Sequence, residues 1–255
     1  SQFLSGLLEK IEATPRMDHR KEYKNAMNTF TEQSFTEAHR EAMRHLADSH
    51  YEQLVRAVAE SRGLYDNEVR ELIDRGPYLG QEAVDAGLVD GLAYRDEVYA
   101  KAKEQAGEDP ELLYLSAYRE RTGWRHDDGE VVALIYGTGT VTRGESTFDP
   151  LTGGFSMGSD TVSKAFRAAI EDDDVQAVLF RVDSPGGSYV ASDVIWRETR
   201  RAREAGKPVV VSRGNLAASG GYFVAMNADK IVAHPGTITG SIGFLRGKIL
   251  IKDTG

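Results

Sequence analysis

Two glycine-rich segments of this sequence combine residue types that could carry out acyl transfer. They are residues 183–188, DSPGGS, and residues 214–222, GNLAASGGY, which include Ser219. Each follows an apolar run typical of a buried strand and precedes a helical pattern. Glycines at such a turn let backbone N–H groups come close to a ligand, where they can stabilise the negative oxygen formed when an acyl carbon is attacked. Ser219 is the candidate nucleophile.

Each segment also has a simpler structural interpretation when taken alone. The sequence PGG suits a strand-to-helix turn, and a serine beside glycines can simply pack a helix against a sheet. However, both segments follow neighbouring predicted strands, so they should meet at the carboxyl edge of a parallel sheet, where α/β proteins gather their sites. This combination favours acyl transfer, with Gly186 or Gly187 and Gly220 as N–H donors to the oxyanion.

A serine hydroxyl needs a base before it can act as a nucleophile. Among the six histidines the strongest candidate is His234, which ends the strand expected after the Ser219 helix, although it also suits a strand end before a Pro-Gly turn. A buried lysine can serve instead, because desolvation lowers the pKa of its ammonium group. Residue types alone do not choose among the 31 lysines and arginines.

Two regions of different periodicity must position these groups. Residues 1–126 are mainly helical by pattern, and their clearest helix begins near Ser34 and ends at Gly63. Residues 127–255 alternate apolar strands with helices, which predicts an α/β fold with a parallel sheet covered on both faces. The expected strands are 130–136, 175–182, 208–212 and 231–233, and the expected helices are 161–170, 191–205 and 218–226. The glycine-rich stretch 137–158 is expected to be a mobile surface loop.

The composition limits the class of protein. Forty acidic and 31 basic side chains give a formal net charge of −9, which argues against nucleic acid as the main partner. There is no cysteine, so a thiol nucleophile, thiolate metal ligands and disulfides are excluded. No apolar run reaches membrane-spanning length and no signal peptide is visible. Both ends look truncated, so we expect any membrane anchor to lie outside this sequence.

Four motifs in register resemble the signal peptide peptidase A (protease IV) family. They are residues 182–188, VDSPGGS; 206–212, GKPVVVS; 217–222, AASGGY; and 239–243, TGSIG. Their order and spacing both match over most of residues 130–247. Because that family is related in fold to Clp protease and crotonase, the resemblance implies a Clp protease/crotonase-like parallel sheet with flanking helices.

The remainder of the chain resembles the double-length form of this family, a tandem of two similar halves. Residues 1–126 resemble the end of the first half and residues 127–255 the core of the second. The segment 23–26, YKNA, resembles the part that carries the general-base lysine, which implies Lys24 as base, with Lys21 as the alternative alignment. The resemblance also assigns Ser241 to orienting the lysine. The oxyanion hole that it implies consists of Gly186, Gly187 and Gly220.

The resemblance implies a serine endopeptidase with a Ser/Lys dyad that hydrolyses cleaved signal peptides and other apolar, unfolded peptides without a metal or organic cofactor. It also implies a homo-oligomer, expected to be a tetramer, at the cell inner membrane with its catalytic domain on the extracytoplasmic side. Three alternatives stay open: a Clp protease-like Ser/His peptidase using His234, a crotonase-type acyl-CoA enzyme, and a non-catalytic scaffold.

Overall fold

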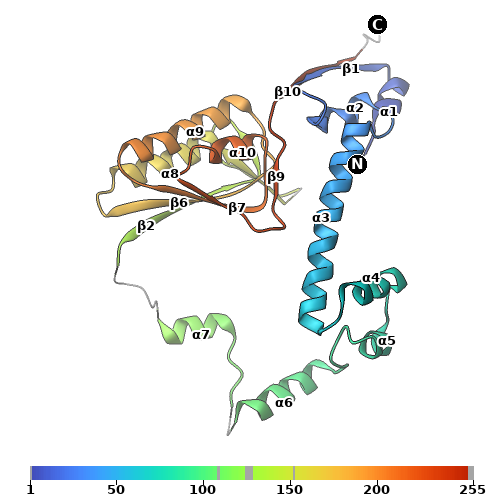
Figure 1. The fold of residues 1–255 in the computed structure, drawn as a ribbon. Coiled ribbons are helices and arrows are strands. Elements are labelled where there is room, and N and C mark those ends of the chain that lie inside the picture. The colour runs from blue at the N-terminus through green and yellow to red at the C-terminus, as the bar shows by residue number, and fades with distance from the viewer. Residues whose placement is uncertain (1, 108–109, 124–128, 152, 252–255) are drawn as a thin grey trace. The chain divides into compact units, whose positions relative to one another are not determined.

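The computed structural model describes residues 2–107, 110–123, 129–151 and 153–251, and it divides into two compact units (Figure 1). The first unit consists of residues 1–47 and 130–255, and the second of residues 48–129. The first 47 residues therefore pack with the α/β part of the chain. The assignment of residues 1–126 and 127–255 to two homologous halves stays a prediction.

A parallel sheet organises the first unit. Its strands follow the order β2-β6-β7-β8, and β9 pairs with the carboxyl half of β7. The strands are β2 (Val131–Thr138), β6 (Val175–Ser184), β7 (Val209–Ala218), β8 (Lys230–Val232) and β9 (Ile238–Gly240). The four strands expected from the apolar runs are confirmed. However, β7 continues to Ala218 instead of ending at Ser212, so Ser219 follows the strand directly.

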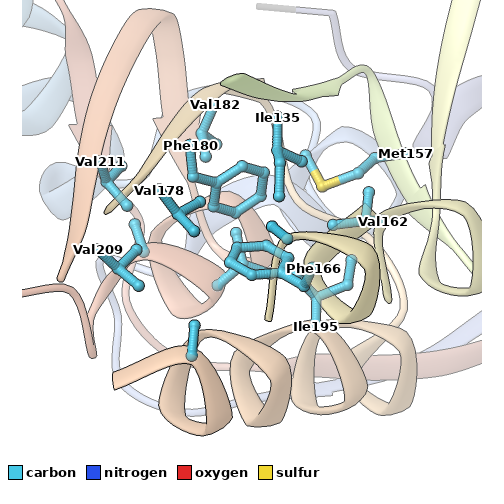
Figure 2. Close-up of a cluster of buried hydrophobic side chains, with 14 of the residues drawn as sticks. Ile135, Met157, Val162, Phe166, Val178, Phe180, Val182, Ile195, Val209 and Val211 are labelled. Carbon is cyan, nitrogen blue, oxygen red and sulfur yellow. The ribbon is translucent and has the colours of Figure 1, made fainter. Parts of the chain in front are cut away.

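Three helices pack on one face of this sheet, namely α8 (Ser159–Glu171), α9 (Tyr189–Glu204) and α10 (Gly220–Ala225) (Figure 1). Their apolar residues and the inward side chains of the strands form a single core, in which the rings of Phe166 and Phe180 meet edge to face at 5.2 Å (Figure 2). On the opposite face of β2, Val132, Leu134 and Tyr136 are exposed. The expectation that helices cover both faces is thus not met within the described residues.

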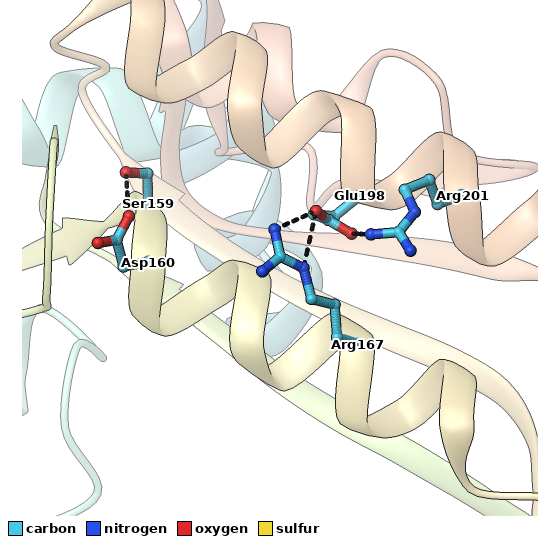
Figure 3. A network of polar contacts seen from close by, with 5 residues as sticks. All are labelled: Ser159, Asp160, Arg167, Glu198 and Arg201. Carbon is cyan, nitrogen blue, oxygen red and sulfur yellow. Dashed lines mark hydrogen bonds and ion pairs between the residues drawn. The ribbon is translucent and has the colours of Figure 1, made fainter.

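A buried carboxylate joins two of these helices. Glu198 in α9 is 1% exposed and accepts hydrogen bonds from Arg167 of α8, at 3.1 Å from Nε and 2.8 Å from Nη2 (Figure 3). Arg201, one turn further along α9, donates to its other oxygen at 2.9 Å. Since a buried charge is tolerated only when it is paired, the two guanidinium groups stabilise the contact between α8 and α9.

Removing both cations from this network should destabilise the fold. In the double variant Arg167→Met/Arg201→Met the carboxylate of Glu198 stays buried without a partner, and we expect the melting temperature to fall by about 5 °C. Adding Glu198→Met should bring the melting temperature most of the way back to that of the parent, because no buried charge remains at this contact. Thermal unfolding followed by circular dichroism measures both changes; a triple variant no more stable than the double one would contradict this explanation.

The stretch 137–158 contains a small sheet, so the expectation that it is a loop is wrong for its described residues. It contains β3 (Thr140–Thr142), β4 (Phe148–Asp149) and β5 (Gly154–Gly158), in the order β3-β5-β4. The chain approaches itself closely here, since a Cβ on Gly139 would lie 1.7 Å from the carbonyl oxygen of Phe155. Glycine is therefore used for close packing in this segment. A bridge from Val141 to Gly187 connects this sheet with the first glycine-rich turn.

A two-stranded antiparallel ribbon joins the two ends of the described chain. Its strands are β1 (Ala13–His19) and β10 (Leu245–Ile251), with Ala13 opposite Ile251 and His19 opposite Leu245 (Figure 1). The helices next to β1 in sequence are α1 (Ser5–Lys10), the 3₁₀ helix η1 (Asn25–Met27) and α2 (Asn28–Thr31). Lys24 immediately precedes η1, so the ribbon brings its segment to the end of the α/β sheet.

The second unit is helical. Helix α3 (Glu37–Arg62) runs into it, followed by α4 (Asp66–Arg75), α5 (Gly80–Asp85), α6 (Arg95–Ala106) and α7 (Leu115–Thr122). Its small core consists of Val55, Ala59 and Val69. The segment 82–90 contains the end of α5 and turns but no strand. Among the described residues, no helix is both long and apolar enough to cross a membrane.

Hydrogen-bonded caps set where two helices begin, and the first begins later than the expected start near Ser34. Helix α3 begins at Glu37 because the hydroxyl of Thr36, not that of Ser34, accepts a hydrogen bond from the His39 N–H at 3.3 Å. Helix α4 begins after Tyr65, whose N–H donates to the Glu68 carboxylate at 2.8 Å. In both helices the capping hydrogen bond involves the residue immediately before the helix.

Candidate active site

Ser219 occupies a strained turn between β7 and α10. Its backbone angles, φ 52° and ψ −115°, fall in a region that residues other than glycine rarely adopt. Its N–H donates to the carbonyl of Gly240 at 3.0 Å, and its carbonyl accepts from the N–H of Phe223 at 2.9 Å. Both backbone groups are therefore held by neighbouring elements. A serine on such a strand-to-helix turn is placed as the nucleophile of an α/β hydrolytic site would be.

The other glycine-rich turn lies directly against Ser219. Gly186 has φ +97°, and a Cβ added to it would lie 2.5 Å from the Gly220 nitrogen and 2.7 Å from the Ser219 Cβ. The hydroxyl of Ser184 holds this turn, since it donates to the Gly139 carbonyl at 2.6 Å and accepts from the Gly186 N–H at 3.1 Å. Only a residue without a side chain allows the two turns to meet this closely.

Two backbone N–H groups are available beside the hydroxyl. The amides of Gly187 and Gly220 have no hydrogen-bond acceptor among the described residues, and a Cβ on Gly220 would lie 3.1 Å from the Gly187 nitrogen. The amide of Gly186 differs, because it already donates to Ser184. Of the three expected oxyanion donors, Gly187 and Gly220 thus have N–H groups free for a ligand, while Gly186 gives the turn its shape.

A methyl group at Gly220 should block this pair of donors. Its Cβ would lie 2.5 Å from the Ser192 Oγ and close to the Gly187 N–H, although the helical backbone itself accepts alanine. We expect Gly220→Ala to lower kcat by about 10²-fold or more, the usual cost of losing an oxyanion donor. Steady-state kinetics measures the loss. Gly91→Ala is the matched control because its Cβ meets no atom within 4 Å; equal kcat values for the two variants would contradict the role of Gly220.

Lys24 brings a buried amine to the same region. Its side chain is 4% exposed, and Nζ donates to the Ser241 carbonyl at 2.5 Å and to the Ser241 Oγ at 3.0 Å. Burial lowers the pKa of the Lys24 ammonium below its ordinary value of 10.5. Lys21, the alternative alignment, is exposed and does not line this cavity. The predicted contact between Lys24 and Ser241 is thus present in the structure.

One cavity of about 630 Å³ is lined by all six residues expected to form the Ser/Lys site. Lys24, Ser219 and Ser241 line it together with the three glycines Gly186, Gly187 and Gly220. His234 lines a different cavity, is exposed, and accepts the Gly236 N–H at its Nδ1 at 3.0 Å. No group of three or more acidic or histidine side chains that could hold a metal occurs in the described part of the chain.

Sequence reasoning missed the apolar walls of this cavity. Tyr189 begins α9, Phe223 and Met226 follow the nucleophile turn, and Ile242 and Phe244 precede β10. The rings of Tyr189 and Phe223 lie 5.6 Å apart. The sequence contained one signal for these walls. Phe223 and Met226 are three residues apart in the expected helix 218–226, so they share the helix face beside the candidate nucleophile. Nothing local in the sequence indicated Ile242 or Phe244.

Comparison with known proteins finds relatives over most of the chain. The family model described as "Peptidase family S49" matches residues 1–109 and 201–254. The chain is 31% identical to "Serine protease SPPA, chloroplastic" of Arabidopsis thaliana over 258 residues, covering 98% of this chain and 38% of that protein. It is 34% identical to "Protease 4" of Salmonella typhi over 248 residues, covering 93% and 39%. It is 30% identical to "Protease 4" of Haemophilus influenzae, covering 94% and 41%. The chain thus spans about two fifths of the length of these relatives.

Proposed function

Because the chain belongs to peptidase family S49, whose fold is of the Clp protease/crotonase type, we propose that it is a serine endopeptidase with Ser219 as nucleophile and Lys24 as base. The observation that carries the proposal is that a buried amine of lowered pKa and a serine on a strained turn line one cavity. Ser241 holds the amine through its carbonyl and hydroxyl oxygens.

The reaction would proceed through an acyl-enzyme. Neutral Lys24 accepts the proton of the Ser219 hydroxyl while Oγ attacks the peptide carbonyl carbon. The N–H groups of Gly187 and Gly220 stabilise the resulting oxyanion. The tetrahedral intermediate collapses, the peptide C–N bond breaks, and the amine leaves with the proton held by Lys24. A water molecule then loses a proton to Lys24 and attacks the ester carbonyl. The second tetrahedral intermediate collapses, the bond to Oγ breaks, and Lys24 returns the proton to Ser219 Oγ as the carboxylic acid leaves.

The walls of the cavity favour apolar peptides. Aromatic and aliphatic side chains surround the reacting groups, so an apolar side chain near the scissile bond would be removed from water on binding. Cleaved signal peptides and other unfolded apolar peptides have this composition and an extended backbone. We also propose, from the family, that the whole protein is a homo-oligomer, expected to be a tetramer, acting at the cell inner membrane on its extracytoplasmic side.

Incubating the whole protein with an apolar, unstructured peptide tests this function. New amino termini identified by mass spectrometry, formed at internal positions and equally in the presence of a chelator, are the expected result. Saturable binding of an acyl-CoA thioester without peptide hydrolysis would instead favour the crotonase-type alternative. An intact peptide together with no reaction toward a fluorophosphonate would favour the non-catalytic scaffold.

A further inference from the structure

Arg213 is a buried cation on the helix-covered face of the sheet. It lies in β7 opposite Val182 of β6, and its side chain points to the same face as those of Val209 and Val211, which belong to the core. The residue is 7% exposed. None of the described Asp or Glu residues lies within ion-pair distance of it, and its Nε has no hydrogen-bond acceptor. An apolar side chain would avoid the cost of burying this charge, so packing alone does not explain the arginine.

The end of β7 lacks a continuous ladder with β6. Regular pairing stops at Arg213 and resumes only where Ala217 lies opposite Ser184, so residues 214–216 of β7 face a single residue of β6. The last residues of β7 pair instead with β9, and the Gly240 carbonyl of β9 also accepts the Ser219 N–H (Figure 1). The position of the nucleophile therefore depends on how firmly β9 is held against β7.

Arg213 connects β7 to β9 through a hydroxyl group. Its Nη1 donates a hydrogen bond to the Thr239 hydroxyl, and that hydroxyl donates to the Ala217 carbonyl at 3.0 Å. Because hydrogen bonds in a chain polarise one another, the charge strengthens the bond to Ala217. Thr239 immediately precedes Gly240, and Ala217 lies two residues before Ser219. The guanidinium group thus supports the segment that leads into the nucleophile turn.

The same guanidinium group also contacts the helix that follows Ser219. Its Cζ atom lies 4.6 Å from the centre of the Tyr222 ring, which is a cation–π contact. Tyr222 is the third residue of α10 and lines the Ser219 cavity. A planar guanidinium can lie against a ring and donate from its edge at the same time, whereas the ammonium of a lysine is a compact point charge. Arg213 therefore contacts the chain on both sides of the nucleophile.

The strained backbone of Ser219 needs support from both sides. A conformation with φ 52° and ψ −115° persists only where the surrounding structure enforces it. We propose that Arg213 is a positioning residue that keeps the Ser219 turn in this conformation, through Thr239 on one side and Tyr222 on the other. The consequence for catalysis rests on the proposed role of Ser219 as nucleophile, whereas the effect on the turn does not.

Arg213→Met in the whole protein tests the proposal. Methionine is flexible and apolar, so it fills the space without a buried charge, and the melting temperature should stay level or rise. We expect kcat for an apolar peptide to fall by about tenfold or more with little change in KM, because a small displacement of the nucleophile slows the reaction. Labelling by a fluorophosphonate should slow by a similar factor. The matched control is Arg200→Met, which removes an exposed arginine paired with Glu204 and should leave all these quantities unchanged.

Variants of Thr239 distinguish positioning from packing. Thr239→Val keeps the shape of the side chain but removes the hydroxyl, so it should lower kcat as Arg213→Met does. Thr239→Ser keeps the hydroxyl and should retain most of the activity of the parent. In the double variant Arg213→Met/Thr239→Val the loss should be smaller than the product of the two single losses, because both substitutions remove the same connection.

Amide hydrogen exchange tests the turn independently of activity. The N–H groups of Ser219 and Phe223 donate to the Gly240 and Ser219 carbonyls, and they should exchange faster in Arg213→Met than in the parent, while the amides of β6 stay unchanged. If the parent neither cleaves peptides nor reacts with the probe but this difference is seen, the proposed function fails and the positioning role stands. The proposal is overturned if the two amides exchange as in the parent, or if the melting temperature falls and the amides of β6 exchange faster as well.

Discussion

Replacing Ser219 with alanine should abolish both turnover and reaction with a fluorophosphonate. The probe phosphonylates an activated hydroxyl with loss of fluoride, and Ser219 is the hydroxyl that lies on the strained turn beside two free N–H groups. Loss of a serine nucleophile lowers kcat by about 10⁶-fold in a well-studied serine protease, and we expect a loss approaching that size. Covalent labelling followed by intact-mass measurement, together with peptide hydrolysis, measures it.

Ser241→Ala is the control for this experiment, since Ser241 lines the same cavity. The variant removes the hydroxyl contact with Lys24 but keeps the carbonyl contact, so labelling should persist, though more slowly. If Ser219→Ala is still labelled while Ser241→Ala is not, Ser241 is the nucleophile and the assignment is wrong. The melting temperature of Ser219→Ala should stay close to that of the parent, because no buried contact of Oγ is lost in the described structure.

Replacing Lys24 with methionine should nearly eliminate hydrolysis without unfolding the protein. Removing a general base costs about 10²- to 10⁴-fold in rate. Methionine has a similar length and carries no charge, so the penalty for burying an ammonium group disappears and stability should not fall. The rate and the melting temperature are measured on the same sample. Lys21→Met, which changes an exposed lysine three residues earlier, should leave both unchanged.

The pH dependence of the parent protein distinguishes the two candidate bases. Lys24 must be neutral to accept a proton, so kcat/KM should rise with pH and level off above a pKa that lies below 10.5. The free energy of unfolding should also rise with pH between that lowered pKa and 10.5, because the unfolded chain binds more protons there. Lys24→Met should remove this stability increment. If the pH dependence of kcat/KM differs between the parent and His234→Gln, the result would favour the Ser/His alternative.

The sheet and the two glycine-rich turns were predictable because their signals are local. Apolar runs predict β6 and β7, and the glycines beside Ser184 and Ser219 identify the turns that follow them. The sequence did not predict that β7 extends to Ala218, because Gly214 and Asn215 suggest the end of a strand. In the structure the Asp183 carboxylate accepts hydrogen bonds from the N–H groups of Asn215 and Leu216, and β9 pairs with the last residues of β7. The small sheet was missed because its glycines suggested a loop.

The approach of Lys24 to Ser241 was predictable from resemblance alone. It depends on the pairing of β1 with β10, which are separated by most of the sequence. Neither strand has a residue pattern that would predict the other as its partner. The burial of Arg213, whose Nη1 donates to the Thr239 hydroxyl, was not predicted for a different reason. Nothing in its neighbourhood distinguishes it from a surface arginine, and its burial follows from the packing of β7, Tyr222 and Thr239.

The β1–β10 ribbon also sets the order in which the segments that carry Lys24 and Ser219 come together during synthesis. Residues 13–19 are synthesised before the α/β core, and their partners, residues 245–251, only after residues 131–240 have been made. Closing so long a loop is slow compared with forming local contacts. A nascent chain would therefore carry Ser219 for some time before Lys24 is held in place, and under the proposed mechanism it would lack its base until the ribbon has formed.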